Sequence, residues 1–117
     1  MTEWSVSFRV SNNGNIDKLL VSLGLCVRAG KVIFGVPQIC DALRKGGRGA
    51  PILVLEAADT SDNTHKRLCD KCKYYKVRHI RLECTSGRLA EAVGKSAQLG
   101  AVAITDEGIS RLVEKYI

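Results

Sequence analysis

The sequence has no apolar run that approaches the length needed to span a bilayer, and no secretory segment is recognisable in it. Its five cysteines are an odd number, and three of them fall within helical patterns. A disulfide framework of a small secreted domain is therefore disfavoured, and we expect a reduced protein of the cytoplasm with no membrane partner.

Recognisable catalytic motifs are also missing. No Ser, Cys or Lys is accompanied by an obvious base and orienting acid, and no phosphate loop of the Walker or dinucleotide type occurs. The glycine-rich segment 46–49 follows a predicted helix and leads into a predicted strand, which is the wrong order for such a loop. We expect a non-enzymatic protein that uses no cofactor.

Metal-ligating residues are few. Cys69 and Cys72 form a Cys-x-x-Cys pair, but a structural zinc site usually needs a second pair or closely spaced histidines. The sequence contains only two histidines, His65 and His79, and the two cysteines lie in the middle of a predicted helix. We therefore expect no metal site, with Cys72 in the core and Cys69 beside it. A cysteine-based metal or redox protein is the less favoured alternative.

The residues that are present indicate a small basic domain. The chain has 117 residues, of which 45% are hydrophobic, enough for one compact core. Its 18 Lys and Arg residues against 12 Asp and Glu give a net charge of +6, which favours a polyanionic partner, RNA or DNA before a membrane.

Hydrophobic periodicity predicts strands that alternate with helices. This pattern is typical of an α/β fold with helices on both faces of a central sheet. We expect one domain over residues 16–117, preceded by a partly ordered lead-in, 1–15, in which Trp4 packs locally. The predicted helices are 16–29 with a cap at Asn15, 36–45, 63–76 capped by Ser61 or Asp62, a short one up to 93 capped by Thr85 or Ser86, and a last one capped by Thr105 or Asp106; the predicted strands are 32–34, 52–55, 77–83 and 101–104.

The strand predicted at 77–83 alternates between apolar and polar residues. The pattern directs Ile80 and Leu82 inward and His79, Arg81 and Glu83 outward, as in an edge strand with one solvated face.

The segment from 27 to 45 is the best candidate for a binding site. Gly35 lets the chain turn from a very short strand into a helix, whose first turn tolerates Pro37. The free N–H groups of this helix end, flanked by Lys31 and Arg28, attract anions such as phosphate. Gln38 adds a paired donor and acceptor that can read a base edge.

Several segments resemble one known family in the correct order. Examples are Leu-Gly-Leu-Cys-Val-Arg-Ala-Gly-Lys at 23–31 and Gly-Val-Pro-Gln at 35–38, with further similarity at 42–46, 52–59, 71–75, 92–95 and 101–106. Over residues 16–117 the chain resembles the kink-turn RNA-binding ribosomal proteins, the superfamily of archaeal L7Ae, eukaryotic L30e and the Gadd45 type, and most of all its small bacterial ylxQ-type members. The resemblance implies a three-layer α/β/α sandwich with a four-stranded mixed sheet.

The resemblance also implies an RNA surface made of the turn at Gly35, the start of the second helix and the loop before the last strand. In the family the glycine lets RNA approach the backbone, polar residues after it contact the sheared G·A pairs of a kink-turn, and the apolar residue at Leu99 presses against a flipped-out base. The RNA-binding residues carried over by position are Arg28, Lys31, Gly35, Val36, Pro37, Gln38, Lys45, Gln98, Leu99 and Gly100.

Two positions depart from the family pattern. Pro37 stands where members carry asparagine or lysine, and Asp41 stands where a lysine is common. Replacing attraction by repulsion near a phosphate costs on the order of 1–2 kcal/mol. We therefore expect a monomeric ribonucleoprotein component that binds structured RNA, ribosomal or kink-turn-like, with altered specificity, and has ribosomal proteins as further partners. The alternative is a protein-interaction module that keeps the fold without kink-turn binding.

Overall fold

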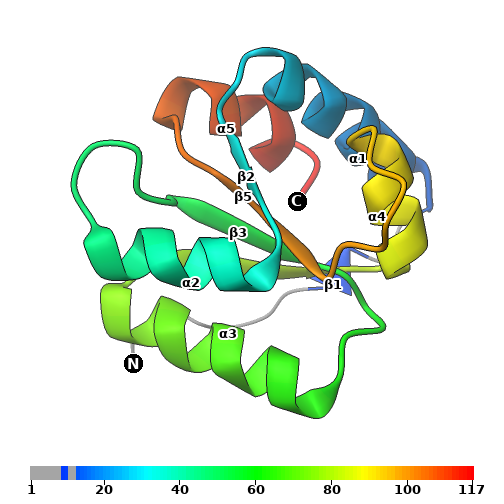
Figure 1. The fold of residues 1–117 in the computed structure, drawn as a ribbon. Helices are drawn as coiled ribbons and strands as arrows, with labels where there is room; N and C mark the ends of the chain where they lie inside the picture. Colours follow the sequence, from blue (N-terminus) through cyan, green and yellow to red (C-terminus); the bar gives the residue numbers. More distant parts are fainter. Residues whose placement is uncertain (1–8, 11–12) are drawn as a thin grey trace.

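The computed structural model describes residues 9–10 and 13–117, so the expected packing of Trp4 lies outside the described residues. Strands and helices alternate along the chain and form layers around one sheet (Figure 1). The elements are β1 (Arg9–Val10), α1 (Asn13–Arg28), β2 (Val32–Phe34), α2 (Val36–Lys45), β3 (Leu53–Glu56), α3 (Asp62–Tyr75), β4 (Arg78–Leu82), α4 (Ser86–Ala92), β5 (Ala101–Ile104) and α5 (Glu107–Glu114).

The sheet is mixed and has the strand order β1-β4-β3-β5-β2. β3 pairs in parallel with β4, whereas β5 runs antiparallel to both β3 and β2. Leu55 lies opposite Ile80 on one side and Val102 on the other. The four strands β2 to β5 confirm the expected four-stranded mixed sheet, and the two-residue strand β1 adds a short parallel pairing to β4.

The two faces of the sheet are covered by different helices, which confirms the α/β/α sandwich (Figure 1). Helices α1, α4 and α5 pack on the face that carries Leu53 and Leu55. Helices α2 and α3 pack on the opposite face, which carries Val54 and Ala103. Because side chains alternate along a strand, Glu56 follows Val54 onto the face beneath α2 and α3.

Side-chain caps fix where three helices begin. Ser61 accepts a hydrogen bond from the backbone N–H of Thr64 at the start of α3, and Thr85 does the same for α4. Asp106 caps α5 by accepting from the N–H groups of Gly108 and Ile109. Each cap is one of the two candidates that the sequence offered.

Three local predictions were wrong. Helix α1 begins at Asn13, so Asn15 lies within its first turn and is not its cap. Strand β3 runs one residue further than expected and includes Glu56, which is completely buried. His79 is also completely buried, because α3 covers the face of β4 that the sequence pattern left to solvent. Within the described residues, no helix is long and apolar enough to cross a membrane.

Candidate RNA interface

Gly35 forms a tight junction between β2 and α2. Its backbone has φ 90° and ψ 146°, its N–H donates to the carbonyl of Ala101 at 3.1 Å, and its own carbonyl accepts from the N–H of Ile39 at 3.0 Å. A Cβ added here would lie only 2.6 Å from Oε1 of Gln38. Gln38 therefore folds its amide over the α-carbon of Gly35. The positive φ favours glycine here, whereas the exposed amide of Gln38 can shift away from an added Cβ.

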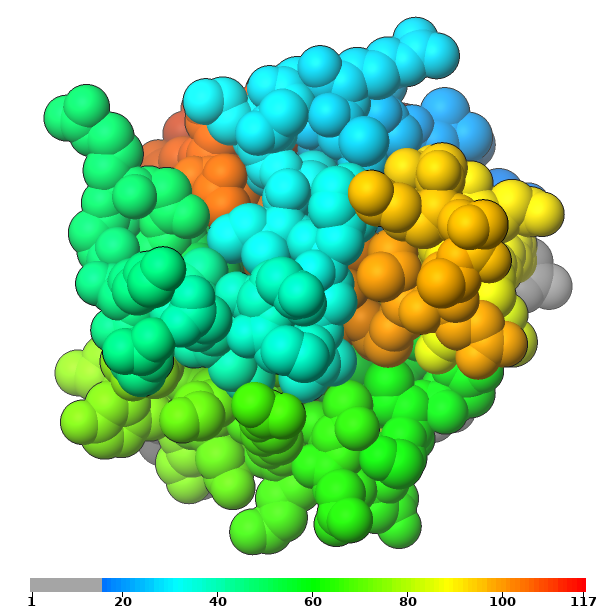
Figure 2. All heavy atoms as spheres, viewed as in Figure 1, coloured from blue at the N-terminus to red at the C-terminus, as the bar shows by residue number. Residues whose placement is uncertain are grey.

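A hollow joins this turn to the loop before β5. Its walls come from segments far apart in the sequence, and Figure 2 shows the orange loop against the cyan turn, with the green segment after β3 below them. The lining residues are Gly35, Val36, Pro37, Thr60, Thr64, Ser86, Gln98, Leu99 and Gly100. The fold thus brings together six of the ten predicted site residues, and Gln38 follows Pro37 in the same turn of helix.

The loop residues contribute to the hollow in different ways. Gln98 is exposed, whereas Leu99 is partly buried and packs against the core on the α1 side of the sheet. The N–H of Leu99 donates to the carbonyl of Ser86 at 3.3 Å. A Cβ on Gly100 would lie 3.3 Å from the methyl group of Thr60 and 3.6 Å from that of Val36, so the floor of the hollow is closely packed.

The N-terminus of α2 is exposed at this hollow. Within the described residues no side chain caps the helix, and Pro37 in its first turn has no N–H to offer. The remaining N–H groups of that turn, together with the positive end of the helix dipole, form an environment suited to an anion.

The predicted cations lie further away. Lys31 precedes β2, and the four residues to Gly35 correspond to about 13 Å of extended chain. Lys45 ends α2, about 12 Å along the helix from Pro37, and its ammonium group lies 3.2 Å from Asp41. These two side chains can contact only the outer parts of a large ligand.

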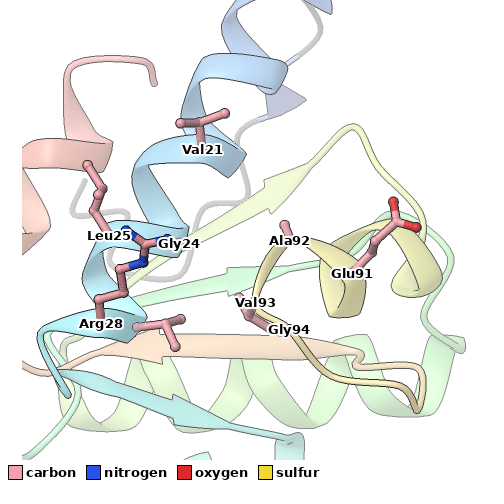
Figure 3. Close-up of a pocket in the computed structure, with 9 residues that line it drawn as sticks. Val21, Gly24, Leu25, Arg28, Glu91, Ala92, Val93 and Gly94 are labelled. Atoms are coloured by element: carbon pink, nitrogen blue, oxygen red, sulfur yellow. The ribbon is translucent and has the colours of Figure 1, made fainter.

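Arg28 belongs to another part of the surface. It lines a hollow between α1 and α4, together with Leu25, Glu91 and Gly94 (Figure 3). This hollow and the one at Gly35 share no lining residue. Arg28 therefore does not line the hollow at Gly35.

Sequence reasoning missed four residues in or near the hollow. Thr60, Thr64 and Ser86 line the hollow, although nothing in their sequence context points to it. Lys95 holds its ammonium group over the ring of Phe34, the residue before Gly35. The sequence offered one signal for Lys95, which is its position directly before the predicted RNA-binding loop 96–100.

Asp41 is charged but compensated. Its Oδ1 accepts from Arg44 at 2.5 Å, and Lys45 lies 3.2 Å from its Oδ2. Hydrogen bonds from Arg44 and then Lys45 hold the pKa of the Asp41 carboxyl below its usual value. The negative charge at this position therefore also occupies two cations that could otherwise face an anionic ligand.

A buried polar cluster lies next to the hollow. Thr60 donates its hydroxyl proton to Glu56, whose carboxylate also accepts from His65 and His79. Burial raises the pKa of the Glu56 carboxyl, but the hydrogen bonds from His79, Thr60 and His65 outweigh burial and hold this pKa below its usual value. The cluster connects the wall of the hollow to the centre of the sheet.

Cys72 is not part of that cluster. It is completely buried in the core with Leu43 and Leu68, as expected, and burial raises the pKa of its thiol to about 12. Such a thiol is inert as a nucleophile at neutral pH, which argues against a redox pair of Cys69 and Cys72.

Known proteins resemble this chain in both sequence and fold. The RNA-binding protein YlxQ of Bacillus subtilis (strain 168) is 39% identical over 88 residues, which cover 75% of this chain and 83% of the relative. The RNA-binding protein YlxQ of Enterococcus faecium is 31% identical over 107 residues, which cover 91% of this chain and 97% of the relative.

Two solved structures share the fold. A protein of unknown function from Bacillus halodurans C superposes with a TM-score of 0.74 at 29% identity, covering 85% of this chain and 95% of the other. The 15.5kD RNA binding protein of Giardia lamblia superposes with a TM-score of 0.76 at 16% identity, covering 99% and 93%.

The family match spans most of the described chain. Residues 17–114, from the second position of the predicted domain to the end of α5, match the model of one family. The chain belongs to the Ribosomal protein L7Ae/L30e/S12e/Gadd45 family.

Proposed function

We propose that this protein binds structured RNA through the hollow around Gly35. The observation that carries the proposal is that an uncapped helix N-terminus and the loop 98–100 meet at one hollow, where the exposed side chain of Gln38 folds over the lining residue Gly35. Curated relatives at 39% and 31% identity are named RNA-binding proteins, which supports the same assignment.

Each part of the interface suits a different part of an RNA. The N–H groups at the start of α2 and the ammonium group of Lys95 suit phosphate oxygens, which set affinity and position. Gln38 offers a donor and an acceptor to a base edge, and the exposed part of Leu99 offers an apolar contact to an unstacked base. The ligand we propose is a kink-turn or a related bend, in which phosphate oxygens and unstacked bases are available together.

The recognition we propose is altered at the centre of the site. Pro37 removes one N–H from the helix start, and Asp41 keeps Arg44 and Lys45 engaged one turn further on. We propose that the protein acts in the cytoplasm, without catalysis, on or near ribosomal RNA. Crosslinking and sequencing of the bound RNA in the native cell identifies that RNA.

Titration of two labelled RNAs tests the proposal. A kink-turn hairpin and a straight duplex of the same composition are titrated with wild-type protein and Gln38→Ala at two salt concentrations. We expect tighter binding of the kink-turn, and a loss of that preference in Gln38→Ala with little change on the duplex. Equal binding of both RNAs by wild type would contradict kink-turn recognition, and absence of binding would contradict the RNA assignment.

One surface feature favours the alternative of a protein-interaction module. On α1, the side chains of Val21 and Leu25 are exposed to 71% and 49%, and they line the hollow between α1 and α4 (Figure 3). Exposed apolar residues that are grouped on one helix are typical of a protein contact. If no RNA binds, this surface is the next one to test with ribosomal proteins as partners.

A further inference from the structure

Three side chains that can ligate a metal lie close together beside the buried carboxylate of Glu56. His65 and Cys69 lie one helical turn apart on α3, and His79 reaches them from β4. Sγ of Cys69 lies 3.5 Å from Nε2 of His65 and 3.6 Å from Nδ1 of His79. The three ligand atoms all lie within 4.8 Å of one another.

A buried carboxylate orients both imidazole rings. Oε1 of Glu56 lies 2.8 Å from Nδ1 of His65 and 2.7 Å from Nε2 of His79. Because a carboxylate only accepts hydrogen bonds, these two nitrogens carry the ring protons. The other nitrogen of each ring, Nε2 of His65 and Nδ1 of His79, faces the sulfur of Cys69.

The sulfur of Cys69 and one nitrogen of each imidazole ring face a common centre. A cation in the centre satisfies all three. Histidines that ligate a metal commonly donate their second N–H to a carboxylate, which is the arrangement around Glu56.

The two sulfur–nitrogen separations fit a tetrahedral ion. With zinc–sulfur bonds of about 2.3 Å and zinc–nitrogen bonds of about 2.0–2.1 Å, tetrahedral geometry separates sulfur and nitrogen by about 3.5 Å. The two observed separations are 3.5 Å and 3.6 Å. Two nitrogens and one sulfur suit Zn²⁺, whereas Mg²⁺ and Ca²⁺ prefer oxygen ligands.

We propose that His65, Cys69 and His79 bind a zinc ion, with Glu56 as the positioning residue that holds both histidines. Water supplies the fourth ligand, since the His65 side chain is 27% exposed and the site therefore reaches solvent. On binding, the Cys69 thiol releases its proton to solvent and its sulfur bonds the metal. The expectation of no metal site rested on the absence of a second cysteine pair or closely spaced histidines, whereas the fold brings the separated His65 and His79 to Cys69.

Cobalt substitution tests the site in the full-length, reduced protein. Co²⁺ in a tetrahedral site with one thiolate gives strong visible bands and a near-ultraviolet charge-transfer band from sulfur. We expect both sets of bands to saturate at one equivalent of Co²⁺ and to disappear when Zn²⁺ is added. An unchanged spectrum, or bands that belong to six-coordinate Co²⁺, would overturn the proposal.

Single substitutions separate this site from the other cysteines. Cys69→Ser is expected to lose the charge-transfer band, whereas Cys72→Ala, three residues further along α3, is the matched control and keeps it. His65→Ala removes a partly exposed side chain, so it is expected to fold and to bind Co²⁺ at least tenfold more weakly. A band that survives Cys69→Ser, or that is lost only in Cys72→Ala, would refute the assignment.

Co²⁺ binding by a Glu56 variant tests whether Glu56 positions the two histidines. Glu56→Gln is expected to weaken Co²⁺ binding by about 10–100-fold while the charge-transfer band at saturation keeps its position, because the three ligands remain. Circular dichroism confirms that each variant is folded. Unchanged Co²⁺ affinity in a folded Glu56→Gln protein would show that Glu56 does not position the histidines.

Discussion

Lys95 holds its ammonium group 4.5 Å from the centre of the Phe34 ring, immediately before the turn at Gly35. The contact places a positive charge at the border of the hollow, whereas Lys45 at the far end of α2 is paired with Asp41. Lys95→Ala is therefore expected to weaken RNA binding several-fold and to lower the slope of log affinity against log salt by about 0.7–0.9. Lys45→Ala is the matched control. A larger loss of RNA affinity in Lys45→Ala than in Lys95→Ala would show that Lys45 contributes more to phosphate binding.

Gly35 should contribute to the stability of the fold and be needed for RNA binding. Gly35→Ala puts a Cβ on a residue with φ 90° and against Gln38, which is expected to cost about 1–2 kcal/mol of the free energy of unfolding and to abolish RNA binding. Gly49→Ala is the control, because its φ of 86° carries the same backbone strain while its Cβ meets open space. Urea unfolding and RNA titration are measured on both. Equal RNA affinity in the two variants would make Gly35 a structural turn only.

Restoring the family pattern should strengthen recognition. Pro37→Asn returns a backbone N–H and a side-chain amide to the first turn of α2, and Asp41→Lys releases Arg44 and Lys45 from their ion pairs. The double variant is expected to bind a kink-turn RNA more tightly, by about 1 kcal/mol for each change, and with a steeper salt dependence. If the double variant gains nothing on the kink-turn, the two departures do not alter recognition.

Acid should weaken one loop contact in a defined pH range. Asp59 accepts hydrogen bonds from Oγ of Ser86 at 2.6 Å and from the N–H of Ser86 at 2.8 Å, and the bond from Oγ is the first cause of a lowered pKa of the Asp59 carboxyl. Because the folded pKa is below the unfolded value of about 3.9, the stabilisation is present above pH 4 and is lost as the pH falls through the folded pKa.

Asp59→Asn tests this contact. The side chain is exposed, so the expected loss near neutral pH is below about 1 kcal/mol of the free energy of unfolding, and the variant's stability should fall less than that of wild type below pH 4. Urea unfolding at several pH values measures both effects. Parallel pH profiles would show that Asp59 carries no such stabilisation.

Local signals predicted much of the fold from the sequence. Ser61, Thr85 and Asp106 cap their helices because the cap depends on residues within one turn, and such a pattern is visible in the sequence. The turn at Gly35 was likewise predictable, because glycine is the residue that most readily adopts the positive φ of a tight turn between a strand and a helix.

The polar cluster could not be predicted in the same way. His79 alternates with Ile80 as an exposed residue would, and its burial depends on α3, which packs over it from another part of the chain. Glu56 follows an apolar run and resembles the first loop residue. Only the pairing of β3 with β4 and the packing of α3 bring these residues to Cys69, so tertiary contacts decide the site.

Thr60 lies between the proposed RNA surface and the proposed zinc site. Its methyl group closes the floor of the hollow beside Gly100, while its hydroxyl group donates to Glu56, which holds the two histidines. If zinc binding changes the affinity for RNA through this side chain, RNA binding must change the affinity for zinc by the same factor, because coupling between two bound ligands is reciprocal. RNA affinity measured with and without zinc, in wild type and Thr60→Val, therefore gives the size of the allosteric coupling directly.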